Sequence, residues 1–530
     1  MRRHGSVRSV RDPVTIGVHR AVGGTPPYVR RDRHDELVDL LRPGRFALVV
    51  GDAAAGKSRL AWAATSAALG RHRLFAPAPT DLAATVAEMA TARRAVLWLD
   101  DLDRFLDVLT PGTLDDLLVG GHRVAVATMR RHEYELLTTE SDRTLAECRH
   151  RLLATAELIH LAPAFSAAEL ARARRVPALA DALAHTDRLP EHLAGGPRLL
   201  ARWRDGTHPR GAALVSAAVD CRRAGFRGPL PVALLDEVQA RYQPGESTAD
   251  AWAWATEPDP SPLLARDGDT VTVFDYLVDH TQRTHPFDPV PDEVLRTALR
   301  HAGTTDARSM GHAAGRAGRY QLALEMHART LDDPIDTPAD LVENLSRRNS
   351  HAAILGHLGR HEEALACHRD VLDARRHLLG PDHPDTLVSR TNVGVALNAL
   401  GRYEAALTEH RGVLSTRNRL LGPDHPDTLT SRDHVAAVLN NLGRQDEALT
   451  AHRAELDACV RVLGATHPDT LVSRHNLAAV LMGMGRFREA ATELRDVLSS
   501  RRHILGPDHP DTRTSRTELI AVMLENARYG

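Results

Sequence analysis

The sequence predicts a multidomain fold, in which an α/β domain with a parallel sheet precedes an all-α superhelix of repeated helix pairs. Two observations carry this prediction. Close to the N-terminus, the apolar run 46–50 leads through a glycine-rich turn into the helix-forming stretch 59–64, and this order of strand, turn and helix is typical of α/β domains. Towards the C-terminus, the segment 379–387 recurs at intervals of 42 residues, as expected of stacked helical repeats.

Length and composition limit the class of protein. A chain of 530 residues has room for about three or four domains. Its net charge of −2, without a basic stripe, does not indicate binding to nucleic acid or to a membrane surface. The four cysteines are scattered singly, as is typical of reduced thiols, and we find neither a signal peptide nor an apolar segment of membrane-spanning length. We therefore expect a cytoplasmic protein.

The glycine-rich turn has the sequence of a phosphate-binding loop. Its pattern, G-x-x-x-x-G-K-[ST], is matched by Gly51, Asp52, Ala53, Ala54, Ala55, Gly56, Lys57 and Ser58. In this motif backbone N–H groups point at the phosphates, the lysine reaches the β- and γ-phosphates, and the serine hydroxyl binds Mg²⁺. Lys57 is the only lysine of the chain. We predict a site for ATP or ADP with Mg²⁺, to which the neighbouring Arg59 also belongs.

A second apolar run, 95–99, ends in two carboxylates. We expect Asp100 to bind Mg²⁺ and Asp101 to polarise the attacking water, slowly, because aspartate is shorter than the usual glutamate. The next predicted strand, 124–128, is followed by Arg130. Since ligands bind at the carboxyl ends of parallel strands, Lys57, Asp100 and Arg130 should converge there. The alternative for Arg130 is a solvated surface arginine.

The chain lacks the residues that guanine-nucleotide sites use. Reading guanine takes an N-K-x-D element, and no second lysine exists to build one. Asp103 also occupies the place where a D-x-x-G switch needs glycine. ATP is therefore the expected nucleotide.

Three further segments complete a resemblance over about 28–203. They are Tyr28-Val29-Arg30, Thr128-Met129-Arg130 and Gly195-Gly196-Pro197. Together with the phosphate loop they resemble the core of the STAND class, the signal-transduction ATPases with numerous domains. The resemblance implies that Tyr28, Val29 and Arg30 help to hold adenine. It also implies that Arg130 senses the nucleotide and that Pro197 packs against the base.

The same resemblance suggests a domain order. We expect a tail at 1–27, the P-loop core at 28–150 with an ASCE-type sheet, a helical lid at 151–208, a winged-helix-like module at 209–310 and repeats at 311–530. A β-hairpin is predicted around Asp267-Gly268. Val273-Phe274-Asp275 falls where STAND proteins carry an M-H-D triplet. Phenylalanine replaces the histidine that senses ADP there, so an ADP-locked resting state does not follow from the resemblance.

The repeats are predicted to be pairs of amphipathic helices. Pro384 suits a first helical position and Gly401-Arg402 suits the turn between the helices. The pattern resembles tetratricopeptide repeats (TPRs), in the 42-residue form of kinesin light chains. Such pairs stack into a superhelix because one pair cannot bury its apolar face alone.

A ladder of polar residues recurs on the first helices of the pairs. Its members are Arg348, Arg390, Asn392, Arg432, Arg474, Asn476 and Arg516. The ladder either lines a groove for a protein or peptide ligand or bridges adjacent repeats through Asp385, Asp427, Asp469 and Asp511; the sequence leaves both open. A histidine ladder is attributed to repeat copying, not to metal binding.

These features together predict an ATP-binding switch of STAND type with slow, Mg²⁺-dependent hydrolysis. A ligand on the repeats would favour the ATP-bound form, and the nucleotide state would gate a homo-oligomer or a partner surface. Because only about thirty residues precede the core, we expect a separate effector protein. The alternatives are a peptide-binding scaffold with a vestigial nucleotide site, and a transcription regulator, for which nucleic-acid binding charge is lacking.

Overall fold

The structure is a computed structural model. It describes residues 5–10 and 28–529, except 107, 110, 119–121, 140–151, 154, 187, 206, 246–247, 259–260, 286–287, 332–334, 336–337, 466 and 505–509. Most of the predicted tail lies outside these residues. The chain forms two compact units, one of Met1–Glu140 with Ala146–Asp333 and one of Ser141–Leu145 with Pro334–Gly530.

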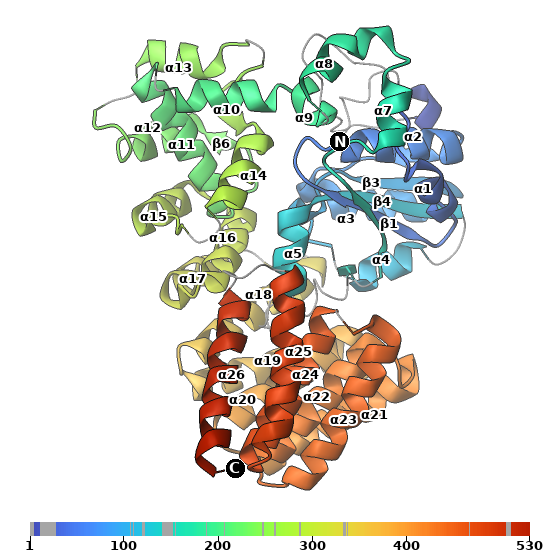
Figure 1. Ribbon diagram of the computed structural model, residues 1–530, viewed down its shortest axis with the longest axis vertical. Helices are drawn as coiled ribbons and strands as arrows, with labels where there is room; N and C mark the ends of the chain where they lie inside the picture. Colours follow the sequence, from blue (N-terminus) through green and yellow to red (C-terminus); the bar gives the residue numbers. More distant parts are fainter. Residues whose placement is uncertain are drawn as a thin grey trace. The chain divides into compact units, whose positions relative to one another are not determined.

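A five-stranded parallel sheet forms the centre of the N-terminal α/β domain of the first unit (Figure 1). Its strands are β1 (Phe46–Gly51), β2 (Arg73–Phe75), β3 (Arg94–Leu99), β4 (His122–Arg130) and β5 (Glu157–Leu161). Their order is β2-β3-β4-β1-β5, so β4 separates the strand before the glycine-rich loop from the strand before the two aspartates. This is the arrangement of ASCE-type sheets, and the predicted fold class is confirmed.

Both faces of the sheet are covered, because successive side chains of a strand point to opposite faces. Leu48 and Val49, for example, belong to different buried sets: Leu48 packs with Met89 and Leu114 on one face, whereas Val49 packs with Leu60 on the other. The helices of this domain are α1 (His34–Leu40), α2 (Lys57–Leu69), α3 (Leu82–Ala90), α4 (Pro111–Leu118) and α5 (Arg131–Thr139). Short 3₁₀ turns lie at Val7–Ser9, Pro79–Asp81 and Leu102–Arg104.

A group of short helices follows β5. It consists of α7 (Ala167–Ala173), a 3₁₀ turn (Pro177–Leu179), α8 (Ala180–His185), α9 (Leu189–Leu193) and α10 (Gly196–Arg204). The start of α7 is fixed by a capping box, in which Ser166 accepts a hydrogen bond from the Glu169 N–H and the Glu169 carboxylate accepts one from the Ser166 N–H. These helices occupy the range predicted for the lid.

The next module has the element order of a winged helix. Its elements are α11 (Pro209–Arg223), β6 (Leu230–Pro231), α12 (Val232–Gln239), α13 (Ala249–Thr256), β7 (Leu264–Asp267), β8 (Thr270–Val273) and α14 (Asp275–Thr284). The strands form an antiparallel sheet in the order β6-β8-β7. The hairpin between β7 and β8 turns at Gly268, whose φ of +60° favours glycine, as the sequence predicts.

Three helices complete the first unit: α15 (Asp292–His301), α16 (Thr304–Arg316) and α17 (Tyr320–Ala328). The sequence places the start of the repeats at 311, but the division into compact units falls at Asp333/Pro334. Hydrogen bonds hold α16 to the first unit, because the backbone N–H groups of Arg227 and Gly228 both donate to Asp306 at 2.8 Å.

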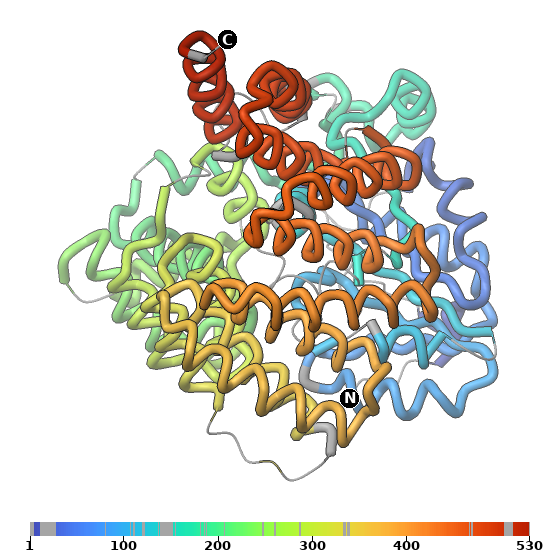
Figure 2. Tube along the Cα trace, turned by 90° about the horizontal axis from the view of Figure 1, so that it is seen from below, coloured from blue at the N-terminus to red at the C-terminus, as the bar shows by residue number. Residues whose placement is uncertain are grey.

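The second unit is an all-α array (Figure 2). Its helices are α18 (Pro338–His357), α19 (His361–Leu379), α20 (Pro384–Ala399), α21 (Tyr403–Leu421), α22 (Pro426–Asn441), α23 (Gln445–Leu463), α24 (Pro468–Gly483), α25 (Phe487–Ile504) and α26 (Pro510–Tyr529). Each packs against the next along the chain. The turns inside the pairs require glycine, since Gly359, Gly401, Gly443 and Gly485 have φ between +71° and +77°. No described helix is both long and apolar enough to cross a membrane.

A ladder of buried arginines joins successive pairs of the array. Arg417 on α21 donates to the Asp427 carbonyl at 3.1 Å and to the Ser431 hydroxyl at 2.9 Å, both on α22. Arg375 makes the same two contacts one repeat earlier, to Asp385 and Ser389. Because these arginines are nearly inaccessible to water, their hydrogen bonds fix the spacing between neighbouring pairs.

We predict that Arg417→Met destabilises the array by about 2 kcal/mol, since hydrogen bonds to a charged group contribute roughly 1.5–3 kcal/mol. Urea unfolding of the full chain, followed by circular dichroism, measures this loss. The control is Arg419→Met, on the same helix, whose exposed side chain pairs with Asp382 and should change the stability by less than about 1 kcal/mol. Equal midpoints for the two variants would contradict the role given to Arg417.

Candidate nucleotide-binding site

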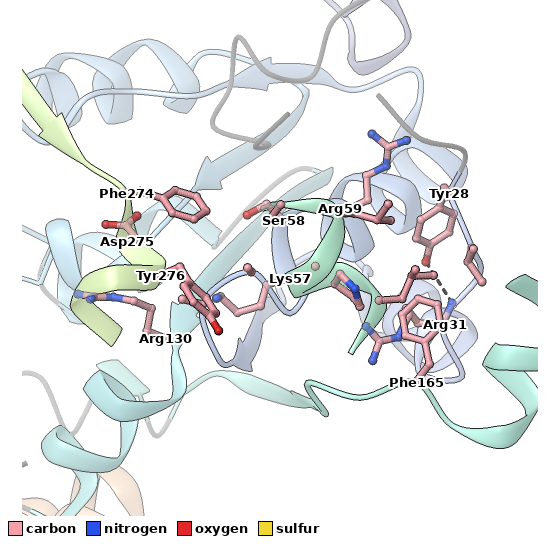
Figure 3. A pocket seen from close by; sticks show the side chains of 18 of the residues that line it. Tyr28, Arg31, Lys57, Ser58, Arg59, Arg130, Phe165, Phe274, Asp275 and Tyr276 are labelled. Carbon is pink, nitrogen blue, oxygen red and sulfur yellow. Dashed lines mark hydrogen bonds between the residues drawn. The ribbon is translucent and has the colours of Figure 1, made fainter. Parts of the chain in front are cut away.

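A cavity opens at the carboxyl edge of the parallel sheet (Figure 3). It is lined by the N-terminal residues 28–31, the glycine-rich loop with the start of α2, Asp101 after β3, Arg130 at the end of β4, the lid, and the start of α14. Lys57 and Ser58 lie between Tyr28 and Phe165 at one end and Phe274 and Asp275 at the other.

The loop between β1 and α2 has the backbone that the phosphate motif requires. Gly56 has φ +89° and Ala54 φ +58°, so the chain turns sharply into α2, which begins at Lys57. A Cβ on Gly51 would lie 2.9 Å from the Leu161 carbonyl of β5, which explains the glycine there. The buried Lys57 ammonium donates to the Asp52 carbonyl at 2.9 Å and is the cation that the loop offers to phosphate oxygens.

The Mg²⁺ ligands predicted from the sequence lie together. Asp100 accepts hydrogen bonds from the hydroxyls of Ser58 and Thr128, each at 2.7 Å. These two hydroxyls hold Asp100 Oδ1 next to the N-terminus of α2, where Mg²⁺ would contact both Ser58 and Asp100. The donor set of oxygens is the one that Mg²⁺ prefers, so these residues fit the ion.

Asp101 has a strained backbone, with φ +56°, and its N–H donates to Thr128 Oγ1 at 3.0 Å. Burial and the carboxylates of Asp100, Asp275 and Asp103 raise the pKa of Asp101 to about 7, against the opposite effect of Lys57. Positive φ at a non-glycine residue costs about 1–3 kcal/mol and concentrates at functional sites. Asp101 lines the cavity.

Arg130 is buried, so the alternative of a solvated surface arginine is wrong. It ends β4 opposite Gly51 of β1 and lines the cavity. Its guanidinium lies 3.2 Å from both Asp103 and Glu133. These carboxylates raise the pKa of Arg130 against burial.

The same two carboxylates also hold an arginine of the winged-helix module. Arg227, between α11 and β6, reaches Asp103 at 2.8 Å and Glu133 at 3.2 Å. Although burial opposes its ionisation, Arg227 and Arg130 together hold the pKa of Glu133 well below its usual range. We call these four residues the charge cluster. It connects Arg130, at the end of β4, to the module.

The other end of the cavity is lined by Tyr28, Val29, Arg31, Phe165 and Pro190. The Arg31 guanidinium lies 4.6 Å from the Phe165 ring centroid. Arg31 is also held by the Ala55 carbonyl at 2.9 Å and by Glu169 at 2.9 Å. The end is apolar and aromatic, and is suited to a flat base.

Two residues predicted to contact adenine, Arg30 and Pro197, do not line the cavity. Arg30 is exposed and pairs with Asp35, whereas Arg31 is 5% exposed and lines the cavity. Pro197 is exposed at the start of α10, and the lid proline on the cavity is Pro190, in α9. The sequence prediction missed Arg31, Phe165 and Pro190.

The start of α14 borders the phosphate end, as the position of the Val273-Phe274-Asp275 triplet suggests. Phe274, Asp275 and Tyr276 line the cavity. Further along α14, Asp279 accepts a hydrogen bond from the Ala53 N–H at 3.2 Å.

Asp52 strengthens this connection between the loop and α14. Its carboxylate lies 3.1 Å from Arg283 of α14 and 3.0 Å from Arg131 of α5. The phosphate loop is therefore held by the winged-helix module as well as by its own domain.

The predicted ladder of the array is only partly available to a ligand. Arg390 pairs with Glu409 at 2.6 Å and Arg474 with Asp496 at 2.8 Å, on the second helix of the same pair; Arg348 lies 3.5 Å from Asp370. These pairs differ from both alternatives considered for the arginines. Arg432 is half-buried and Arg516 exposed.

The asparagines of that ladder are packed inside the array. Asn392 is 1% exposed and donates to Asn349 at 2.9 Å. Asn476 donates to Asp433 at 2.7 Å. Both join first helices of adjacent pairs, so the prediction that Asn392 lines a ligand groove is wrong.

Comparison with known proteins identifies the repeats. Residues 344–411, 390–453 and 470–511 match the tetratricopeptide repeat family. The C-terminal array is therefore a TPR array. No curated protein matches the chain.

Two solved structures illustrate the likeness. A putative kinesin light chain with nearly identical TPR-like repeats, from Podosopora anserina, is 21% identical over 37% of this chain and 94% of its own, with a TM-score of 0.31. A STAND protein with a tetratricopeptide repeat sensor, from Pyrococcus horikoshii, is 12% identical over 94% of this chain and 86% of its own, with a TM-score of 0.29. At such low values these likenesses carry no functional conclusion, which rests on the residues of the cavity.

We predict that an ATP analogue with a lysine-reactive acyl phosphate modifies Lys57, because no other lysine exists in the chain. Peptide mass spectrometry locates the label, and excess ATP present during the reaction should prevent labelling. Lys57→Ala should abolish ATP binding in calorimetry, whereas the control Ser66→Ala, on the same helix, should bind normally. Undiminished binding by Lys57→Ala would contradict the site.

Proposed function

We propose that the first unit is an ATP- and Mg²⁺-binding signal-transduction switch of STAND type, and that the TPR array binds the protein or peptide that sets it. The observation that carries this proposal is the charge cluster. It joins Arg130, at the phosphate end of the cavity, to Arg227 of a separate module. A cavity that served only to hold nucleotide would not need this connection.

Different residues of the cavity suit different parts of the nucleotide. Tyr28, Phe165 and Pro190 suit the base, and Lys57 with the loop N–H groups suits the phosphates. Mg²⁺, held through Ser58 and Asp100, would neutralise charge on the phosphates. The aromatic end and the phosphate end lie on opposite sides of Lys57, as an extended nucleotide requires.

Nucleotide state acts on the module through competition for Arg130. In the described structure Arg130 is bound to Asp103 and Glu133. A γ-phosphate near Lys57 would offer this arginine a stronger anion and weaken its hold on both carboxylates. Because Arg227 shares the same carboxylates, they would then hold Arg227 alone, and the contact between the core and the module would change. ATP and ADP would thereby favour different positions of the module.

Hydrolysis would return the switch to its starting state. Asp101 is placed to accept a proton from water, and a base with a pKa near the working pH is effective. We predict that Asp101→Asn lowers ATP turnover by about 100-fold and leaves ATP affinity within a few-fold. Phosphate release and calorimetry measure the two quantities, and the exposed Asp39→Asn is the control. Unchanged turnover would remove Asp101 from this role.

The switch itself is tested at Arg227. We predict that Arg227→Met leaves Asp103 and Glu133 to Arg130 alone, so that they hold it more firmly against a γ-phosphate, and lowers the affinity for ATP relative to ADP by roughly tenfold, the size of a typical coupling free energy. Amide hydrogen exchange should increase in α16, to which Arg227 is bonded through Ser309 and Asp306. The control is Arg241→Met, which breaks an ion pair with Glu293 elsewhere in the module. An unchanged ATP-to-ADP preference would refute the coupling.

A further inference from the structure

One buried cluster of the TPR array differs from all its counterparts. Asp433 on α22 and His452 and Glu455 on α23 bring one ligand atom each to within 4.8 Å of the other two. His452 and Glu455 are 1% exposed and Asp433 is 8% exposed. We call these three residues the acid–histidine cluster.

The contacts inside the cluster do not form good hydrogen bonds. His452 Nδ1 lies 3.4 Å from Glu455 Oε2 and 3.6 Å from Asp433 Oδ1. Within the described residues, His452 Nδ1 and Glu455 Oε2 have no hydrogen-bond partner. Leaving such atoms buried costs about 1–3 kcal/mol each, so their arrangement calls for another explanation.

The same separations suit a tetrahedral metal ion. Zinc binds nitrogen and oxygen ligands at about 2.0–2.2 Å, which places neighbouring ligands about 3.3–3.6 Å apart. The two distances from His452 Nδ1 to the carboxylates, 3.4 Å and 3.6 Å, correspond to edges of such a tetrahedron. One imidazole and two carboxylates also form a common ligand set of divalent transition metals.

The repeats provide an internal comparison. One period earlier, the positions of Asp433, Glu455 and Cys459 are occupied by Thr391, Val413 and Arg417. At the position of Glu455 the other copies have Val371 and Val497, and at that of Cys459 they have Arg375 and Arg501.

In this unit the change from arginine to Cys459 therefore removes one positive charge, and Asp433 and Glu455 add two negative charges at the same buried place. Packing of the repeat does not require these changes, because the sister units fold without them. A bound divalent cation would balance the added charge, since a buried carboxylate needs a partner of opposite sign.

Polar neighbours hold the carboxylates in place. The Ser473 hydroxyl donates to Glu455 Oε1 at 2.7 Å, which leaves Oε2 for a metal. Asn476 donates to Asp433 Oδ1 at 2.7 Å. In the sister unit the serine equivalent to Ser473 is Ser431, and it accepts a hydrogen bond from Arg417 instead. Such outer hydrogen bonds orient ligands in metal sites.

We propose that Asp433, His452 and Glu455 bind a divalent transition-metal ion, for which zinc is the probe, between the copies of the repeated segment that begin at Leu421 and Leu463. The ion would join α22 to α23 where the arginine that joins pairs elsewhere is replaced by Cys459. This site is independent of the nucleotide cavity.

The test uses the full chain, freed of metal with a chelator and dialysed against zinc without nucleotide. Elemental analysis by mass spectrometry should give one zinc more per wild-type chain than per Glu455→Val chain, with binding at this site weakened by at least about 100-fold in the variant. Asp433→Thr should lose the same equivalent. Both variants carry the residue of a sister unit, so their folding is expected. The control is Glu447→Gln, which changes an exposed carboxylate on the same helix.

Zinc bound elsewhere, for instance by surface histidines, contributes equally to wild type and variants and cancels in the comparison. Zinc should also raise the thermal unfolding midpoint of the wild type and of Glu447→Gln, but not that of Glu455→Val. Cobalt in place of zinc should give visible absorption bands that Glu455→Val lacks. Equal metal content in wild type and Glu455→Val would overturn the proposal. So would the absence of any zinc-dependent stabilisation of the wild type.

Discussion

Arg130 and Arg227 share the carboxylates of Asp103 and Glu133, and the arrangement of the N-terminal unit depends on this sharing. Each carboxylate is nearly inaccessible and touches both arginines, so removing any one of the four leaves the buried cluster with an unbalanced charge. Such losses cost about 3–5 kcal/mol, whereas exposed ion pairs such as Arg241–Glu293 contribute about 0–1 kcal/mol. The turn after β3, the start of α5 and the connection after α11 must therefore keep their positions together.

A second set of contacts also joins the nucleotide cavity to the winged-helix module. The phosphate loop is bonded to α14 through Asp52 with Arg283 and through the Ala53 N–H with Asp279. The loop and the charge cluster are thus two contacts of one module with one nucleotide cavity. A phosphate that moves the loop or draws Arg130 away acts on α14 and on Arg227 at once. This double contact gives differential binding of two nucleotides a structural route to the module.

The sequence predicts the parts of the site that backbone geometry dictates. A φ of +89° at Gly56 and the close approach of Gly51 to β5 allow few residues, so the loop is recognisable from its residues alone. Arg31 and Pro190 were missed because Arg30 and Pro197 fit the short patterns, and only packing shows which residues line the cavity. Glu133 and Arg227 are 94 positions apart, and no local pattern connects them. Long-range ion pairs of this kind require the fold.

The TPR array shows the converse. The repeated sequence predicts its helices and turns correctly, but it leads to the wrong prediction for Asn392. A polar residue repeated on a first helix can contribute to packing between pairs as well as line a ligand groove. Departures from the copies carry different information. Positions that keep the same residue in most copies show what folding of the repeat requires. In the preceding unit Val413 and Arg417 occupy such positions and are buried. Glu455 and Cys459 both depart from the repeat at the same buried place, so folding of the repeat does not explain them. The atoms of His452 and Glu455 that lack hydrogen-bond partners indicate metal binding as the reason.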